Sequence, residues 1–92
     1  MVLTVAEIES ILTMDLKNWE FIDSMIVRFI PRNNDISLGS IVEKIWDLAE
    51  KNDHHPDILL TYSGIKITLF THDESGVTQK DINLARSLEK IY

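Results

Sequence analysis

The stretch that decides the fold is ILLTYSGIKITLFT, residues 58–71. Its second half places isoleucine or leucine at every other position from 65 to 69, the period of a strand with one buried face. Ser63-Gly64 divides the stretch where a turn is favoured. The pattern therefore predicts a hairpin made of the strands Ile58–Tyr62 and Ile65–Thr71.

A second hairpin is predicted nearer the N-terminus. Trp19–Ile22 and Met25–Ile30 are rich in aromatic and β-branched residues, and Asp23-Ser24 lies between them. Such runs separated by two turn-forming residues are typical of paired strands. Pro31 cannot donate a backbone hydrogen bond, so we expect the second run to end there.

Helical patterns surround both hairpins. Thr4 and Glu7 have capping-box spacing before an apolar helical period, which predicts a first helix from residue 5. A second helix is expected over Ile36–Lys51, and a third opens at Thr78 with Asp81 three residues later. The order α-β-β-α-β-β-α indicates an α+β fold, in which three helices pack on one face of a four-stranded antiparallel sheet.

Length and charge limit the possible functions. The 92 residues are expected to form one domain, residues 1–92. Nine Lys and Arg against fifteen Asp and Glu leave a net charge of -6, so no nucleic-acid partner is expected. No membrane partner is expected either, because no apolar run spans a bilayer. With no cysteine and no signal-peptide pattern at the start, the expectation is a cytoplasmic protein.

The chemistry-bearing residues gather between Glu50 and Asp81. All three histidines of the chain, His54, His55 and His72, lie there, and the second hairpin is expected to return His72 toward the other two. Imidazole exchanges protons near neutral pH, and neighbouring carboxylates can fix its tautomer. Five acids accompany the histidines: Glu50, Asp53, Asp73, Glu74 and Asp81. The cluster suits acid/base catalysis.

Two other interpretations stay open at this point. Three imidazoles could bind zinc with one open position, although adjacent histidines in extended backbone point to opposite sides. Loop histidines beside a proline could also be ordinary surface residues. Spacing alone does not name a reaction.

The aromatic residues Trp19, Phe21, Phe29 and Trp46 are expected to serve core or interface packing.

The linked motif resembles the pterin-4a-carbinolamine dehydratases, also known as dimerisation cofactors of a hepatocyte nuclear factor. The pattern is an acid, three residues, His-His-Pro, an aromatic, a further histidine and an aspartate. Here it reads Glu50, then His54-His55-Pro56, Tyr62, His72 and Asp81. Residues 67–72 and 81–85 are also similar to the family, as is the Trp19-Glu20 hairpin, so the resemblance covers most of the chain.

The resemblance implies a reaction and a set of roles. A 4a-hydroxytetrahydropterin would lose water to give quinonoid dihydropterin, without metal or other cofactor. His54, His55 and His72 would be catalytic, with acid and base unassigned between His54 and His72. The substrate would contact His54, His55, Pro56, Thr71, His72, Asp73 and Glu74, while Glu50, Asp53 and Asp81 would orient the histidines from behind.

The resemblance also implies self-association and shows one departure. Family members are homodimers or homotetramers, and a non-catalytic dimerisation or partner-binding module of the same fold is the alternative function. An aromatic residue usually follows the His-His-Pro-acid segment, but Ile58 stands at that position here. We therefore expect a different wall beside the pterin and an altered substrate preference.

Overall fold

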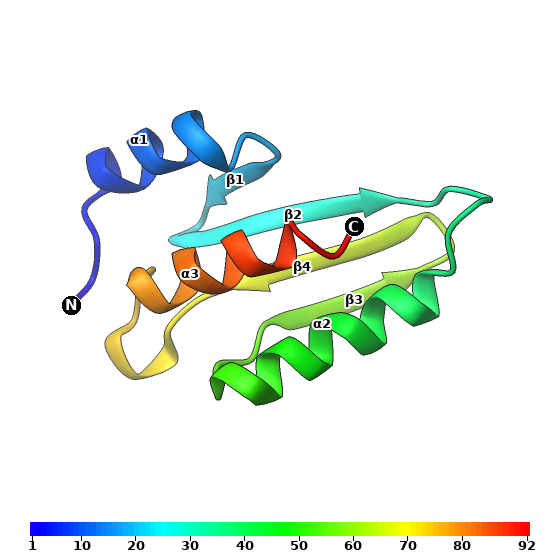
Figure 1. Cartoon of the computed structure of the whole chain (residues 1–92). Coiled ribbons are helices and arrows are strands. Elements are labelled where there is room, and N and C mark those ends of the chain that lie inside the picture. Colours follow the sequence, from blue (N-terminus) through cyan, green and yellow to red (C-terminus); the bar gives the residue numbers. More distant parts are fainter.

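The computed structural model describes all of residues 1–92, and its elements follow the predicted order. Three helices and a four-stranded sheet alternate as α-β-β-α-β-β-α, so the predicted fold class is confirmed (Figure 1). The elements are α1 (Val5–Asp15), β1 (Trp19–Ile22), β2 (Met25–Pro31), α2 (Leu38–Asn52), β3 (Asp57–Thr61), β4 (Gly64–Leu69), a 3-10 turn (His72–Glu74) and α3 (Gln79–Leu88).

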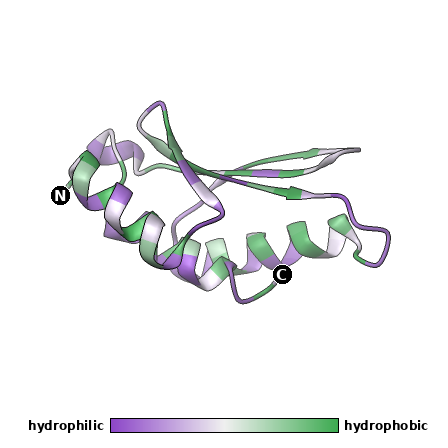
Figure 2. Cartoon of the chain, turned by 90° about the horizontal axis from the view of Figure 1, so that it is seen from above, coloured by the Kyte–Doolittle hydropathy of each residue, from purple (hydrophilic) through white to green (hydrophobic).

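The sheet has the order β1-β2-β4-β3, and every neighbouring pair is antiparallel. Asp23 and Ser24 join β1 to β2 with φ of 51° and 67°, as a two-residue turn that matches strand twist requires. Cross-strand partners such as Ile58 and Ile67 share one face. The helices all lie on that side of the sheet (Figure 2).

The core forms between the helices and the alternating apolar positions of the strands. Seventeen buried residues make one hydrophobic cluster. Ile65, Ile67 and Leu69 of β4 contribute fully buried side chains, as the alternation predicts, and Trp19 is buried at 3% exposure. Phe29 and Trp46 are instead 47% and 45% exposed, so they are not core residues.

Local capping sets the helix ends. Thr4 with Glu7 and Thr78 with Asp81 both form complete capping boxes, as the sequence spacing predicts. The second helix begins two residues later than predicted, because Ser37 is its N-cap and accepts a hydrogen bond from the Ser40 N–H.

One predicted strand is too long. The sequence places Thr71 in a strand with His72 at its end, but β4 ends at Leu69. Thr71 then bridges Gly76, and this closes a loop in which His72 opens the 3-10 turn. No helix has both the length and the apolar character needed to cross a membrane, and the predicted cytoplasmic location stays a prediction.

Candidate active site

The three histidines come from two segments at one end of the sheet. His54 and His55 follow the C-terminal end of α2, and His72 follows β4; both segments lie at the same end of the sheet (Figure 1). Asp53 ends α2 in the left-handed conformation with φ 49° and ψ 42°, which aspartate tolerates better than most residues. The chain then turns toward β3, and the His54 N–H closes the helix on the Ala49 carbonyl.

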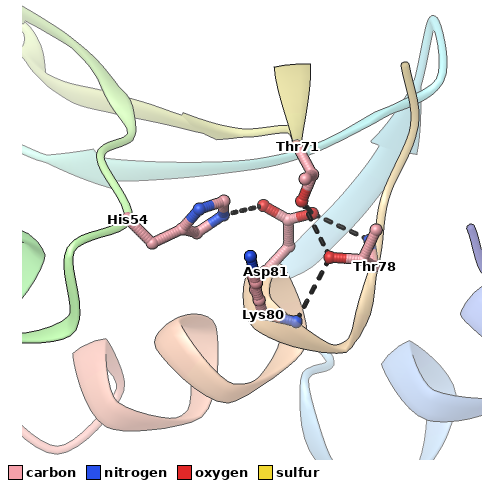
Figure 3. A network of polar contacts seen from close by, with 5 residues as sticks. All are labelled: His54, Thr71, Thr78, Lys80 and Asp81. Atoms are coloured by element: carbon pink, nitrogen blue, oxygen red, sulfur yellow. Dashed lines mark hydrogen bonds and ion pairs between the residues drawn. The ribbon is translucent and has the colours of Figure 1, made fainter. Parts of the chain in front are cut away.

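His54 is held by a buried carboxylate. Its Nε2 lies 2.5 Å from Asp81 Oδ1, with the His54 side chain 13% exposed and that of Asp81 fully buried (Figure 3). Asp81 Oδ2 accepts the Thr71 hydroxyl at 2.7 Å and the Thr78 N–H at 2.9 Å. The carboxylate therefore has hydrogen-bond donors on both oxygens, which suits its ionised form because that form has acceptors only.

The direction of each proton in this network follows from the donor inventory. Thr71 has one hydroxyl hydrogen and gives it to Asp81, so the 2.8 Å contact between Thr71 and Thr78 must carry the Thr78 hydrogen. Thr78 Oγ1 in turn accepts the Lys80 N–H. The Asp81 carboxylate can only accept, so His54 Nε2 must carry the hydrogen of their contact. In the neutral ring Nδ1 is then an acceptor. Nδ1 points away from Asp81 (Figure 3).

His55 contacts different partners. Its ring centroid lies 5.0 Å from that of Trp46, with the planes tilted by 50°. Its Nε2 is 3.5 Å from Glu50 Oε2, at a position where the two side chains are 37% and 60% exposed. Such an exposed, long contact contributes little stability, so Glu50 orients His55 only weakly.

His72 is exposed, like His55 and unlike His54. It lies edge-on to Phe70 with centroids 5.2 Å apart, and its ring nitrogens make no hydrogen bond within the chain. An exposed imidazole without a carboxylate partner is free to donate a proton to a ligand or accept one.

Two hollows meet at His55 and His72. The polar hollow, about 330 Å³, is lined by the three histidines with Asp53, Phe70, Thr71, Asp73 and Lys80. The apolar hollow, about 670 Å³, is lined by Val42, Trp46, Pro56, Asp57, Ile58 and Leu60 together with the two shared histidines. Both volumes are in the range of small-molecule sites, roughly 300–1,000 Å³. A flat ligand with one polar edge could occupy both.

Not all predicted contact residues face these hollows. Pro56 and Asp73 line one hollow each, and Thr71 lines the polar one although its hydroxyl is used by Asp81 and Thr78. Glu74 instead pairs with the Met1 amino group.

Lys80 lines the polar hollow and was missed from the sequence. It stands in the first turn of α3 beside Asp81, in no motif that marks it. As for metals, no three histidine or acidic side chains are grouped to hold an ion.

Comparison with known proteins gives the family. The sequence model of the pterin 4 alpha carbinolamine dehydratases matches residues 1–91. A Picosynechococcus protein whose name assigns it provisionally to these dehydratases is 37% identical over 89 residues, or 97% of this chain and 96% of that protein. A provisionally named Mycobacterium avium dehydratase is 36% identical over 90 residues, covering 98% and 95% of the two chains.

A solved structure agrees. The crystal structure of a transcriptional coactivator/pterin dehydratase from Brucella melitensis is similar with a TM-score of 0.87 and 32% identity, over 99% of this chain and 98% of that one. The chain therefore belongs to the pterin-4a-carbinolamine dehydratase family. The family predicted from the histidine motif is confirmed, and so is its enzyme class, a hydro-lyase.

Proposed function

We propose that this chain dehydrates a 4a-hydroxytetrahydropterin to the quinonoid dihydropterin by histidine acid/base catalysis. The carbon–oxygen bond at C4a breaks and its electrons leave with the hydroxyl. The neighbouring ring nitrogen loses its proton and forms a double bond to C4a. The leaving hydroxide takes one proton from the enzyme acid and becomes water. The enzyme base takes the proton of the ring nitrogen, and transfer of that proton to the acid through solvent restores both groups, so the step consumes no cofactor.

The observation that carries the proposal is the contact between His54 and buried Asp81. A carboxylate that accepts Nε2–H leaves the Nδ1 lone pair free, which is the form required of a general base. We assign His54 to removal of the proton from the ring nitrogen. Asp81 would also stabilise the imidazolium that forms.

His72 is the proposed acid. Its ring lies on the border of the two hollows, is exposed, and has no hydrogen-bond partner within the chain, so its proton is available to the leaving hydroxyl. Hydroxide is a poor leaving group, and protonation during bond cleavage removes that barrier. His55, held by Trp46 and weakly by Glu50, is assigned to placing the ring.

The test is the decay of freshly generated 4a-hydroxytetrahydropterin, followed by stopped-flow absorbance with and without protein. The chain should accelerate the decay, and the double variant His54→Ala, His72→Ala should lose the acceleration. Glu7→Gln is the matched control, because Glu7 lies in the capping box of α1, away from both hollows. No acceleration by the wild-type protein, or full activity of the double variant, contradicts the proposal.

We further propose a homodimer or homotetramer, supported by apolar side chains at the free edge of the sheet. Strand β3 is an edge strand, and Leu59, Leu60 and the following Tyr62 are 57%, 51% and 82% exposed. Unpaired edges with apolar side chains favour association. Size-exclusion chromatography with light scattering should show an assembly at micromolar concentration, whereas a clean monomer contradicts it. An assembly that binds pterin without turnover would favour the alternative, a non-catalytic binding module.

A further inference from the structure

Trp46 is a large apolar side chain on the exposed side of α2. Ile41, Ile45 and Ala49 form the buried stripe of α2, and Trp46 lies one position beyond Ile45. Tryptophan is highly buried on average, so an indole that is nearly half exposed leaves a large apolar area open to a ligand. The other tryptophan, Trp19, is 3% exposed and its Nε1 donates to Glu89, whereas Trp46 is 45% exposed and its Nε1 has no partner.

The helix places Trp46 on the face that borders the candidate site. Val42, Trp46 and Glu50 are spaced by four residues, so they lie along one side of α2. Trp46 contacts the His55 ring and Glu50 approaches its Nε2, while Val42 and Trp46 both line the apolar hollow. The indole therefore lies next to the histidines and forms part of the wall of the apolar hollow.

The side chain at position 58 bears on the role of Trp46. Ile58 lines the same hollow as Trp46. An isoleucine side chain has no flat face to stack on a ring. The hollow nevertheless contains an aromatic face, because Trp46 of α2 supplies one.

We infer that Trp46 is a substrate-binding residue whose indole stacks on the flat ring of the pterin. The inference rests on the proposed dehydratase function. The ring would lie across the border of the two hollows, with its apolar face on Trp46 and its polar edge toward the histidines. Trp46 would fix the ring and take no part in proton transfer.

The experiment compares Trp46→Ala, Trp46→Phe and the double variant Trp46→Ala, Ile58→Trp with wild type. The readouts are KM and kcat for dehydration and the dissociation constant of a stable 7,8-dihydropterin, measured by calorimetry. Trp46→Ala should raise KM and the dissociation constant about tenfold, equivalent to about 1.4 kcal/mol, with kcat within about threefold. Trp46→Phe should keep most of the affinity, and Ile58→Trp should restore part of what alanine removes.

Phe29→Ala is the matched control. Phe29 is an aromatic side chain of nearly the same exposure, 47%, on β2 and outside both hollows, so its loss should leave KM unchanged. Thermal unfolding checks that each variant is folded. If Trp46→Ala does not fold, Trp46→Phe and the single variant Ile58→Trp are compared with wild type instead. Ile58→Trp adds a second aromatic face to the hollow and should tighten binding of the pterin.

The outcomes separate the inference from the function on which it rests. An active wild type with an unchanged KM in folded Trp46→Ala overturns the inference alone. A fall in kcat at constant KM also overturns it, because Trp46 would then act only through His55. Loss of the assembly at constant KM overturns it as well, because a second copy of the chain would then cover the indole. A wild type that neither binds nor dehydrates the pterin overturns both.

Discussion

Replacing Asp81 with asparagine keeps the shape of a fully buried side chain and removes its charge. The carboxylate receives three donors: His54 Nε2, the Thr71 hydroxyl and the Thr78 N–H, at 2.5, 2.7 and 2.9 Å. The amide has one oxygen to offer in place of two. If that oxygen faced His54, the amide nitrogen would oppose the Thr78 N–H and strand a buried donor, at a cost of about 1–3 kcal/mol.

The other orientation is therefore favoured, and it changes the tautomer of His54. The oxygen then accepts from Thr71 and Thr78, and the amide N–H points at His54 Nε2, which must become an acceptor. The ring hydrogen moves to Nδ1, the atom assigned as the base. All three hydrogen bonds then lose their charged partner, at about 1 kcal/mol each. Relief of the buried charge offsets part of that loss.

We expect Asp81→Asn to lower the free energy of unfolding by about 2 kcal/mol and Tm by about 10 °C. The expected fall in kcat is about 100-fold or more, because the base carries a hydrogen in the wrong place. Stopped-flow turnover and thermal unfolding measure the two effects. Glu7→Gln is the matched control, since Glu7 occupies the same capping-box position in α1, and it should leave kcat unchanged.

A double-mutant cycle with His54→Ala shows whether Asp81 acts through His54. In that background Asp81→Asn should change kcat by less than about threefold, since coupled residues are not additive. The reasoning is refuted if Asp81→Asn lowers Tm but not kcat, because Asp81 would then be only a helix cap.

Three further predictions follow from the same geometry. His72→Ala should lower kcat about 100-fold while moving Tm by less than about 3 °C, because the ring is exposed; calorimetry alongside turnover checks both. Thr71→Val removes a buried hydroxyl that donates to Asp81, and chemical denaturation should show a loss of about 1–3 kcal/mol with a smaller fall in kcat than Asp81→Asn gives. Hydrogen bonds from Thr4 lower the pKa of Glu7 from its ordinary 4.5, so its contribution to stability is present above that pH and lost as pH falls through the lowered value. The unfolding curves of wild type and Glu7→Gln should accordingly differ at neutral pH and converge in acid; a constant difference at all pH values would contradict this.

The fold was predictable because its signals are local. Alternation of apolar and polar side chains in residues 65–69 indicates a strand with one buried face. Each capping box is indicated by two residues that lie three positions apart. The errors lie at element ends. The pattern of apolar residues starts at Ile36, but Ser37 is the better N-cap and moves the helix start. Likewise Thr71 bridges Gly76, and this pairing across a loop ends β4 early.

The site was only partly predictable, because much of it depends on contacts between distant segments. Three histidines flanked by acids indicate a proton-transfer site, and Asp81 was named among the orienting residues. The hydroxyl relay from Thr78 through Thr71 spans the two ends of the connection between β4 and α3, and no spacing rule reveals it. Trp46 was predicted to serve core or interface packing. It lies one position off the buried stripe of α2 with its ring beside His55, so it is not a core residue.

The central claim is that a pterin lies between His54 and His72 with its reacting nitrogen toward His54 Nδ1. A crystal structure of the protein with a stable 7,8-dihydropterin tests it most directly. The account predicts the ring across the border of the two hollows, within hydrogen-bond distance of His54 Nδ1 and of His72. A ring bound elsewhere, or one whose pyrazine nitrogen lies far from both histidines, would contradict the account.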